Sequence, residues 1–167
     1  IEASAKKLQG NKIKFDGVTV TGTENLMTAA TLAEGRTTLT NVAKEPEIID
    51  LADMLNSMGA KISGAGTDEI IIDGVENLHG AKYLIPADRI EAGTYLAAAA
   101  VTNGDITVQG INPKRLMKVI YKLNDTGAQI SYDDNSISIS MKEDRPRPVD
   151  VTTAPFPEFP TDMQAQF

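Results

Sequence analysis

The chain carries an internal repeat with a period of about 68 residues. At an offset of 68, Leu55-Asn56 recurs as Leu123-Asn124, Gly59-Ala60 as Gly127-Ala128, and Ile62-Ser63 as Ile130-Ser131. Upstream, at an offset of 69, Ala29-Ala30 recurs as Ala98-Ala99 and Gly35 as Gly104. A period of this length indicates a duplicated supersecondary unit and constrains the architecture more than any single motif. In such proteins we expect sites to lie between the copies.

Residues 10–74 form the first copy, and their patterns predict the order β-α-β-α-β-β. Alternating polar and apolar residues predict short strands, whereas apolar residues at helical spacing predict helices. Thr23 opens the first predicted helix with capping chemistry, Pro46 suits the first turn of the second, and Gly59 ends it. The predicted strands are 12–15, 37–42, 60–63 and 69–73, and the predicted helices are 23–33 and 46–58.

Residues 82–141 repeat this order, and a third copy begins near the end of the chain. The predicted strands are 82–85, 105–109, 128–132 and 136–141, and the helices are 91–102 and 112–126, with a turn at 133–135. Proline-rich connections follow, and residues 161–167 start a helix that lacks its packing face. The predicted class is therefore α+β, with two copies and a truncated third. Because the first residue is Ile1, we expect a piece of a longer protein.

Composition excludes several classes of function. The net charge of −7, from 16 Lys and Arg against 23 Asp and Glu, argues against a nucleic-acid binder. No apolar run approaches 18 residues, which argues against a membrane partner. The absence of cysteine fits a reducing compartment and leaves no thiol chemistry. The single histidine, His79, lies in a predicted turn, and Asp133-Asp134 is another turn, so we predict no metal site.

Five segments together resemble the UDP-N-acetylglucosamine enolpyruvyl transferases, also called UDP-N-acetylglucosamine 1-carboxyvinyltransferases. These segments are 18–27, 44–50, 55–63, 88–94 and 153–167. The most specific is the last, which contains Phe-Pro-Thr-Asp-Met-Gln-Ala-Gln-Phe at its end. The resemblance covers essentially the whole chain, which would be less than half of such an enzyme.

The resemblance implies an inside-out α/β barrel fold, with six β-α-β-α-β-β units in two domains and the substrates between them. It implies that residues 1–86 are the last repeat of the first domain and 87–144 the first repeat of the second. Residues 145–167 would be a linker and the truncated start of the next repeat. The hinge between the domains would fall near residues 86–88.

The resemblance also implies a reaction and its partners. The enolpyruvyl group of phosphoenolpyruvate would move to the 3′-hydroxyl of UDP-N-acetylglucosamine with release of phosphate, without a cofactor. This is the first committed step of bacterial peptidoglycan synthesis, in the cytoplasm, and links the protein to cell-wall biogenesis, cell shape, cell division and antibiotic action. The remaining partner would be the rest of the parent chain.

Asp162 is the predicted catalytic residue and also a predicted contact to UDP-N-acetylglucosamine. A positioned carboxylate can accept the proton of a hydroxyl as the new C–O bond forms. In the family the aspartate of the Pro-Thr-Asp-Met string lies at the sugar hydroxyl, and Asp162 matches it. The alternative is structural: Thr161 or Asp162 would be an ordinary N-cap of the helix.

Gly17, Val18, Thr19 and Val20 match the family segment that lines the uridine and diphosphate site. Backbone N–H groups ahead of a helix can bind phosphate without a formal charge. The family often has Lys where this chain has Gly17, so one charged contact is missing. The alternative is a plain connection between strand and helix in which Thr19 and Gly17 only make the turn.

Arg89 and Glu91 follow the predicted hinge and are candidates for orienting substrate or a closing domain. The alternative for this pair is a solvated structural contact. The family's Lys-Asn pair, its Cys- or Asp-bearing loop and its further arginines have no match in this chain. We therefore expect the 167-residue chain alone to be inactive. Two other interpretations stay open: a non-catalytic α/β repeat module that binds a nucleotide sugar or a protein, and the sister 3-phosphoshikimate 1-carboxyvinyltransferase.

Overall fold

The computed structural model describes residue 2, residues 4–142 and residues 145–167. The chain divides into two compact units, Ile1–Ile85 and Pro86–Phe167. Each unit has its own cluster of buried apolar side chains. The boundary predicted between residues 86 and 87 lies one residue from this division.

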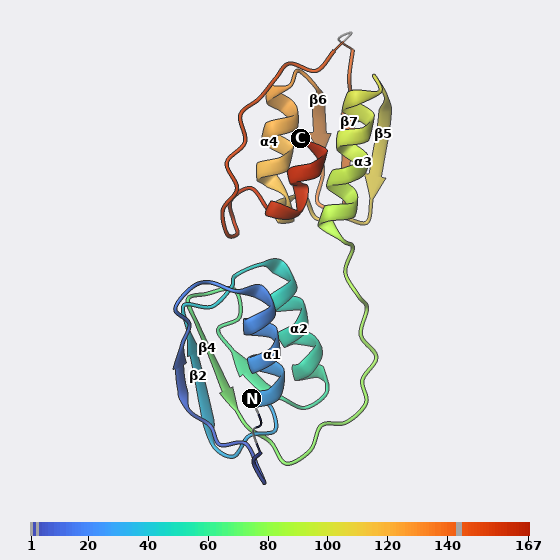
Figure 1. The fold of residues 1–167 in the computed structure, drawn as a ribbon. Coiled ribbons are helices and arrows are strands. Elements are labelled where there is room, and N and C mark those ends of the chain that lie inside the picture. The colour runs from blue at the N-terminus through green and yellow to red at the C-terminus, as the bar shows by residue number, and fades with distance from the viewer. Residues whose placement is uncertain (1, 3, 143–144) are drawn as a thin grey trace. The chain divides into compact units, whose positions relative to one another are not determined.

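The first unit is a four-stranded sheet with two helices. Its elements are β1 (Lys12–Lys14), α1 (Val20–Ala30), β2 (Arg36–Thr40), α2 (Pro46–Ser57), β3 (Lys61–Ser63) and β4 (Glu69–Asp73). The strand order is β1-β2-β4-β3, in which β1 is parallel to β2 and the other pairs are antiparallel. Figure 1 shows α1 and α2 side by side on one face of this sheet.

The core of the first unit follows from the two-residue period of its strands. In β4, Ile70 and Ile72 are fully buried, whereas Ile71 between them is only partly buried. Successive side chains of a strand point to opposite faces, so one face of β4 supplies the core. Leu39 of β2 and Ile48 of α2 complete that core and are also fully buried.

The second unit combines a three-stranded antiparallel sheet with two α-helices and two short 3-10 helices. Its elements are α3 (Arg89–Val101), β5 (Asp105–Gln109), η1 (Pro113–Arg115), α4 (Met117–Asp125), β6 (Gln129–Tyr132), β7 (Ser136–Ser140) and η2 (Thr161–Gln166). The order β5-β7-β6 reproduces β2-β4-β3 of the first unit. α1 and α3 begin 69 residues apart, as do β2 and β5.

The strand predicted at residues 82–85 is wrong. The structure has no strand there, and the side chains of Leu84 and Ile85 are 90% and 83% exposed. In the described part of the second unit, no strand pairs with β5 in the way that β1 pairs with β2. A segment without a ladder partner gains no interstrand hydrogen bonds, so its apolar residues alone do not make it a strand.

Two predicted helix starts are also corrected. α1 begins at Val20 rather than Thr23, because the Thr19 hydroxyl accepts a hydrogen bond from the Gly22 N–H at 3.2 Å and caps the helix. The segment predicted as one helix from residue 112 to 126 is divided at Leu116 into η1 and α4. Asn112 caps η1 as expected, since its side chain accepts from the Lys114 N–H.

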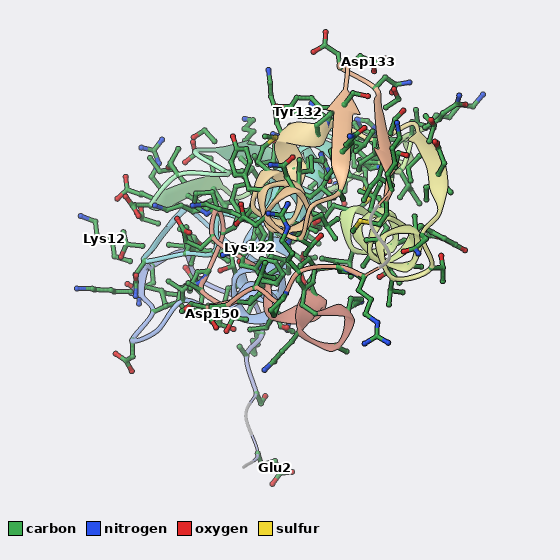
Figure 2. All side chains as sticks on the ribbon, turned by 90° about the horizontal axis from the view of Figure 1, so that it is seen from above. Glu2, Lys12, Lys122, Tyr132, Asp133 and Asp150 are labelled. Atoms are coloured by element: carbon green, nitrogen blue, oxygen red, sulfur yellow. The ribbon has the colours of Figure 1, made fainter. Side chains whose placement is uncertain are left out.

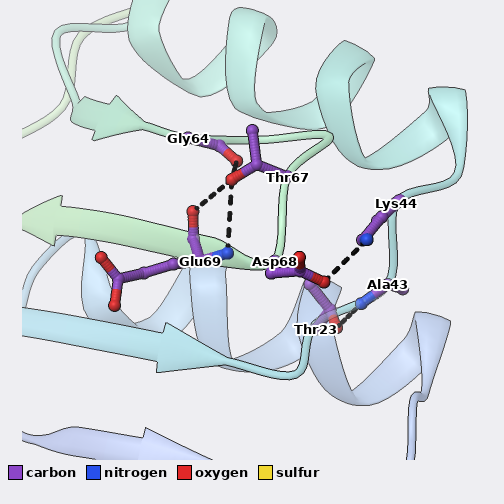
Figure 3. A network of polar contacts seen from close by, with 7 residues as sticks. All are labelled: Thr23, Ala43, Lys44, Gly64, Thr67, Asp68 and Glu69. Carbon is purple, nitrogen blue, oxygen red and sulfur yellow. Dashed lines mark hydrogen bonds and ion pairs between the residues drawn. The ribbon is translucent and has the colours of Figure 1, made fainter.

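Thr23 has a structural role that differs from the predicted role as a helix cap. Its side chain is fully buried, and its hydroxyl donates to the Thr19 carbonyl at 2.7 Å. The same hydroxyl accepts from the Ala43 N–H at 3.1 Å and so joins α1 to the segment before α2 (Figure 3). Beside it, Lys44 forms an ion pair with Asp68 at 2.7 Å.

Thr23→Val is expected to lower the free energy of unfolding of the first unit by about 1–3 kcal/mol, because the buried Ala43 N–H loses its acceptor. Urea denaturation followed by circular dichroism measures this change. Thr28→Val is the matched control, since Thr28 is exposed on the same helix. An equal loss in both variants would show that the exchange of a hydroxyl for a methyl group on the helix, and not the buried hydrogen bond, sets the effect.

The segment after residue 158 packs into the core of the second unit. Phe159 is 4% exposed, and Met163 of η2 is fully buried in the same cluster as α3 and α4. The Met163 side chain lies against Gly93 of α3, where a Cβ atom would come within 3.0 Å of it. Gln166 donates a hydrogen bond to the Thr94 hydroxyl at 2.9 Å. The expectation that this helix lacks a packing face is therefore wrong.

A bidentate ion pair joins the two inner strands of the first sheet, β2 and β4, at the end where β2 begins and β4 ends. Arg36 Nε and Nη2 donate to the two carboxylate oxygens of Asp73 at 2.7 and 2.9 Å. This hydrogen bonding lowers the pKa of Asp73 and raises the pKa of Arg36. A carboxylate with a lowered pKa contributes stability above its unfolded pKa, and this stability is lost as the pH falls through the folded value.

Asp73→Asn is expected to lower the urea midpoint at pH 7 and to have a smaller effect at about pH 3, because there the carboxylate of the unfolded chain is largely protonated and the contribution of the ion pair to stability is being lost. Asp53→Asn is the control, because Asp53 is exposed on α2 and forms no ion pair within the described residues. A difference between wild type and Asp73→Asn that stays constant from pH 7 to pH 3 would contradict the ion-pair explanation.

Asp133 lies in the turn between β6 and β7, as predicted. Its carboxylate accepts a hydrogen bond from the Asn135 N–H at 2.8 Å, and this contact lowers its pKa. Figure 2 shows its side chain at the tip of this hairpin, pointing away from the ribbon.

Among the described residues, no three His, Cys, Asp or Glu side chains gather as metal ligands. None of the helices in the described segments has the length and apolar character needed to cross a bilayer.

Candidate functional site

Residues 17–20 connect β1 to α1 in the first unit. Gly17, Val18 and Thr19 are exposed, and Val20 is the first residue of the helix. Thr19 makes the turn into α1, since its hydroxyl caps the helix by accepting from the Gly22 N–H. This role does not exclude a ligand, because the cap uses one acceptor and leaves the N–H groups of the first turn directed out of the helix.

The first turn of α1 offers backbone donors to an anion. Within the described residues, the N–H groups of Val20 and Thr21 donate no hydrogen bond. The N-terminus of a helix also carries a partial positive charge, which favours a phosphate group. At Gly17, an added Cβ would meet no atom within 4 Å, so a longer side chain fits there.

Asp162 lies in the first turn of η2 and is exposed. Pro160 occupies the N-cap position, and no side chain caps η2, so the capping role predicted for Thr161 or Asp162 is wrong. Within the described residues the Asp162 carboxylate accepts no hydrogen bond. The adjacent buried Met163 fixes the backbone of η2 against α3. Asp162 thus combines a held backbone with an open carboxylate, which suits a proton acceptor.

Arg89 and Glu91 lie in the first turn of α3, which Asp88 caps by accepting from the Ile90 N–H at 2.8 Å. Arg89 is only 5% exposed, and its guanidinium lies 5.7 Å from the centre of the Phe156 ring. The interpretation of Arg89 as a solvated contact is therefore wrong. Glu91 is exposed, and the described residues include no ion pair between it and Arg89.

Phe156 was missed by the sequence prediction. A guanidinium over an aromatic face gains electrostatic attraction, which holds the arginine in one orientation. The available signal was the alternation of proline and phenylalanine in Pro-Phe-Pro, which places an aromatic ring on an extended and restricted backbone.

The two units hold different parts of the predicted site. Residues 17–20 belong to the first unit, whereas Arg89, Glu91 and Asp162 belong to the second. Within the second unit, the contact between α3 and η2 brings the elements of Arg89 and Asp162 together. The predicted site residues of each unit lie at the start of a helical element: α1 in the first unit, and α3 and η2 in the second.

Comparisons with known proteins agree with this architecture. A family model described as EPSP synthase (3-phosphoshikimate 1-carboxyvinyltransferase) matches residues 1–167. A UDP-N-acetylglucosamine 1-carboxyvinyltransferase from Hydrogenovibrio crunogenus is 54% identical over 167 residues, which make up 100% of this chain and 40% of that protein. The chain thus spans well under half the length of this relative.

Two solved structures share the fold. The enolpyruvyl transferase NikO from Streptomyces tendae superposes with a TM-score of 0.82 at 20% identity, covering 98% of this chain and 42% of that one. EPSP synthase from Acinetobacter baumannii superposes with a TM-score of 0.58 at 24% identity, covering 80% of this chain and 32% of that one. Because the family model matches the whole chain, the chain belongs to the EPSP synthase family of enolpyruvyl transferases.

Proposed function

We propose that this chain is part of a transferase that moves the enolpyruvyl group of phosphoenolpyruvate to the 3′-hydroxyl of UDP-N-acetylglucosamine. The observation that carries this proposal is the 54% identity to a UDP-N-acetylglucosamine 1-carboxyvinyltransferase over the full 167 residues. The open carboxylate of Asp162 supports it, because this residue matches the most specific string of the resemblance.

In the proposed reaction, the hydroxyl oxygen forms a bond to the enolpyruvyl group while the bond between that group and phosphate breaks. The hydroxyl must lose its proton, and Asp162 accepts it. Gly17, Val18, Thr19 and Val20 contact the uridine and diphosphate groups through backbone N–H donors. Arg89 orients the substrate or the closing domain, and Glu91 is a secondary candidate for this role. The reaction uses no cofactor.

The proposal extends to the organisation of the complete protein. Residues 1–86 would be the last repeat of the first domain, 87–144 the first repeat of the second, and 145–167 a linker and the start of a further repeat of an inside-out α/β barrel. A chain that spans 40% of its relative would lack much of the active site and would show no turnover alone. The reaction would take place in the bacterial cytoplasm and feed peptidoglycan synthesis and cell division, which makes the protein an antibiotic target.

Phosphate release by the complete protein tests the proposal. With phosphoenolpyruvate as donor, we expect release with UDP-N-acetylglucosamine and none with 3-phosphoshikimate. The opposite preference would identify the sister enzyme. Saturable binding of UDP-N-acetylglucosamine without any phosphate release would instead identify a non-catalytic binding module.

Gly17→Lys is expected to tighten binding of UDP-N-acetylglucosamine to the complete protein by about two- to five-fold, which is the range of an exposed ion pair worth up to about 1 kcal/mol. The added ammonium would reach the diphosphate from a position where no atom obstructs the side chain. Isothermal titration calorimetry measures the dissociation constant, and the gain should shrink as salt is raised.

Gly80→Lys is the matched control for the added charge. Gly80 is exposed, and an added Cβ there also meets no atom within 4 Å. If both variants tighten binding equally, the effect comes from net charge alone, and the assignment of residues 17–20 to the diphosphate site fails. Tightening by Gly17→Lys only would support that assignment.

A further inference from the structure

The strand β5 of the second unit has a neighbouring strand on one side only. The order of its sheet is β5-β7-β6, so β5 pairs with β7 and lies at the edge (Figure 1). In the first unit the corresponding strand β2 pairs with β4 and also with the parallel strand β1. Within the described residues, β5 therefore occupies a position that is internal in the first copy and open in the second.

The open edge of β5 presents backbone donors and acceptors at every second residue. The Gly110 N–H donates to the Asn135 carbonyl at 2.8 Å, so Gly110 faces β7. Hydrogen-bonded pairs alternate with non-bonded pairs along an antiparallel ladder. Residues 105, 107 and 109 therefore direct their N–H and C=O groups away from β7, toward the side where the described residues provide no strand.

The first unit shows how a neighbouring strand uses such groups. Thr38, which lies 69 residues before Thr107, donates its N–H to the Asn11 carbonyl at 2.9 Å. Leu39 on the inner face of β2 is fully buried, whereas its counterpart Val108 is only partly buried. The missing neighbour thus leaves both backbone hydrogen bonds and apolar side-chain area of β5 uncovered.

β5 lacks the residues that commonly prevent sheet edges from pairing. Lysine and proline at an edge strand oppose association with another edge. The edge strand β1 carries Lys12 and Lys14, and antiparallel pairing of two β1 strands about Ile13 would place these lysines opposite each other. β5 has the sequence Asp-Ile-Thr-Val-Gln and contains neither lysine nor proline. The other edge of its sheet, β6, corresponds to β3, which is also an edge strand in the first unit.

We propose that two copies of this chain associate through antiparallel pairing of their β5 strands. With the two-fold axis at Thr107, each Thr107 pairs with the same residue of the second copy, and each Asp105 pairs with Gln109 of the second copy. All of these residues direct their backbone groups to the open side, so the edge gains its hydrogen bonds in a single register. The same register brings Ile106 beside Val108 of the second copy on the inner face.

The proposed register is complementary in charge as well as in hydrogen bonding. Asp105 is the charged residue of β5, and the two-fold axis places the two aspartates at opposite ends of the interface. Each aspartate lies opposite the amide of Gln109, which can donate to a carboxylate. Sliding one strand by two residues in either direction leaves fewer of the outward-directed residues paired, so the register with Thr107 on the axis is favoured.

Sedimentation equilibrium of the 167-residue chain, combined with hydrogen exchange, tests the association. An edge of five residues buries less area than the roughly 1,200 Å² of stable complexes, so we expect a weak dimer that forms only at high concentration. Exchange at the amides of Asp105, Thr107 and Gln109 should slow as the concentration rises. The amides of β6 are the reference and should show no such change.

Two lysine substitutions on β5 test the register. Gln109→Lys places an ammonium group opposite Asp105 at both ends of the interface and should strengthen the dimer by about two- to tenfold. Thr107→Lys places two ammonium groups opposite each other at the axis and should weaken it by about two- to fivefold. Both side chains are exposed, so neither change disturbs the core. Both variants reduce the negative charge equally, so a general effect of charge would shift them in the same direction.

Thr107→Val is the control for the lost hydroxyl. The hydroxyls of Thr107 and Ser138 are in contact at 2.8 Å, and Thr107→Lys removes this contact. Thr107→Val removes it as well but adds no charge and keeps the backbone donor, so it should leave the dissociation constant of the dimer unchanged within about twofold.

Three outcomes would overturn the proposal. The first is a chain that stays monomeric at about 1 mM. The second is slow exchange of the β5 amides in a monomer, which would show that a segment of the same chain covers the edge. The third is an equal effect of Gln109→Lys and Thr107→Lys. The inference involves none of the residues of the proposed transferase site, so its failure leaves that proposal untouched.

Discussion

Asp162→Asn in the complete protein is expected to lower kcat by about 10²- to 10⁴-fold, the range for loss of a general base. Asparagine keeps the size of the side chain but cannot accept the hydroxyl proton. The fold should not change, because the described contacts of η2 come from Met163 and Gln166 rather than from the Asp162 carboxylate. A coupled assay of phosphate release from phosphoenolpyruvate and UDP-N-acetylglucosamine measures the rate.

Asp150→Asn is the matched control for Asp162→Asn. Asp150 is exposed in the same unit, lies in an irregular segment and forms no ion pair within the described residues. It should keep the wild-type kcat. If Asp162→Asn raised KM and left kcat unchanged, the carboxylate would be a substrate contact and not the proton acceptor. Equal losses in the two variants would point to a general effect of negative charge.

Ile70→Ala is expected to lower the free energy of unfolding of the first unit by about 2–5 kcal/mol, because it removes a fully buried side chain and leaves a cavity. Ile70 lies in β4, which pairs with both β2 and β3, so the neighbouring strands hold the backbone in place around the gap. Native-state hydrogen exchange of the amides in β2 and β4 measures the loss.

Ile71→Ala is the control on the same strand. Its side chain is on the opposite face and is only partly buried, so the expected loss is no more than about 1 kcal/mol. Amides in β5 and β7 serve as an internal reference, since the second unit has a separate core. Equal losses from Ile70→Ala and Ile71→Ala would contradict the placement of the core on one face of β4.

Local patterns predicted most elements correctly. The strand at residues 69–73 has the predicted bounds, and the helix that starts at Pro46 begins at the predicted residue. Proline fixes a backbone angle suited to a first helical turn, and glycine with a positive φ ends a helix, so these signals act over a few residues. Gly59 adopts such a conformation, with φ of 98°.

The errors arose where distant residues decide the structure. Residues 82–85 are apolar enough for a strand but have no strand beside them. Thr23 resembles a cap in sequence, yet Ala43, 20 residues away, makes it a buried link between segments. Met163 packs against Gly93, a contact that no local period indicates.

For the candidate sites too, some properties follow from the local sequence and others from contacts between distant residues. The sequence by itself determined the repeat, the family and the candidacy of Asp162, because these depend on spacing and on residue identity. Tertiary structure decided that Asp162 is open and does not act as a cap, that Arg89 lies over Phe156, and that β5 has no strand on its outer side within the described residues. Burial and strand pairing depend on which segments meet in space, and sequence separation carries little information about such meetings.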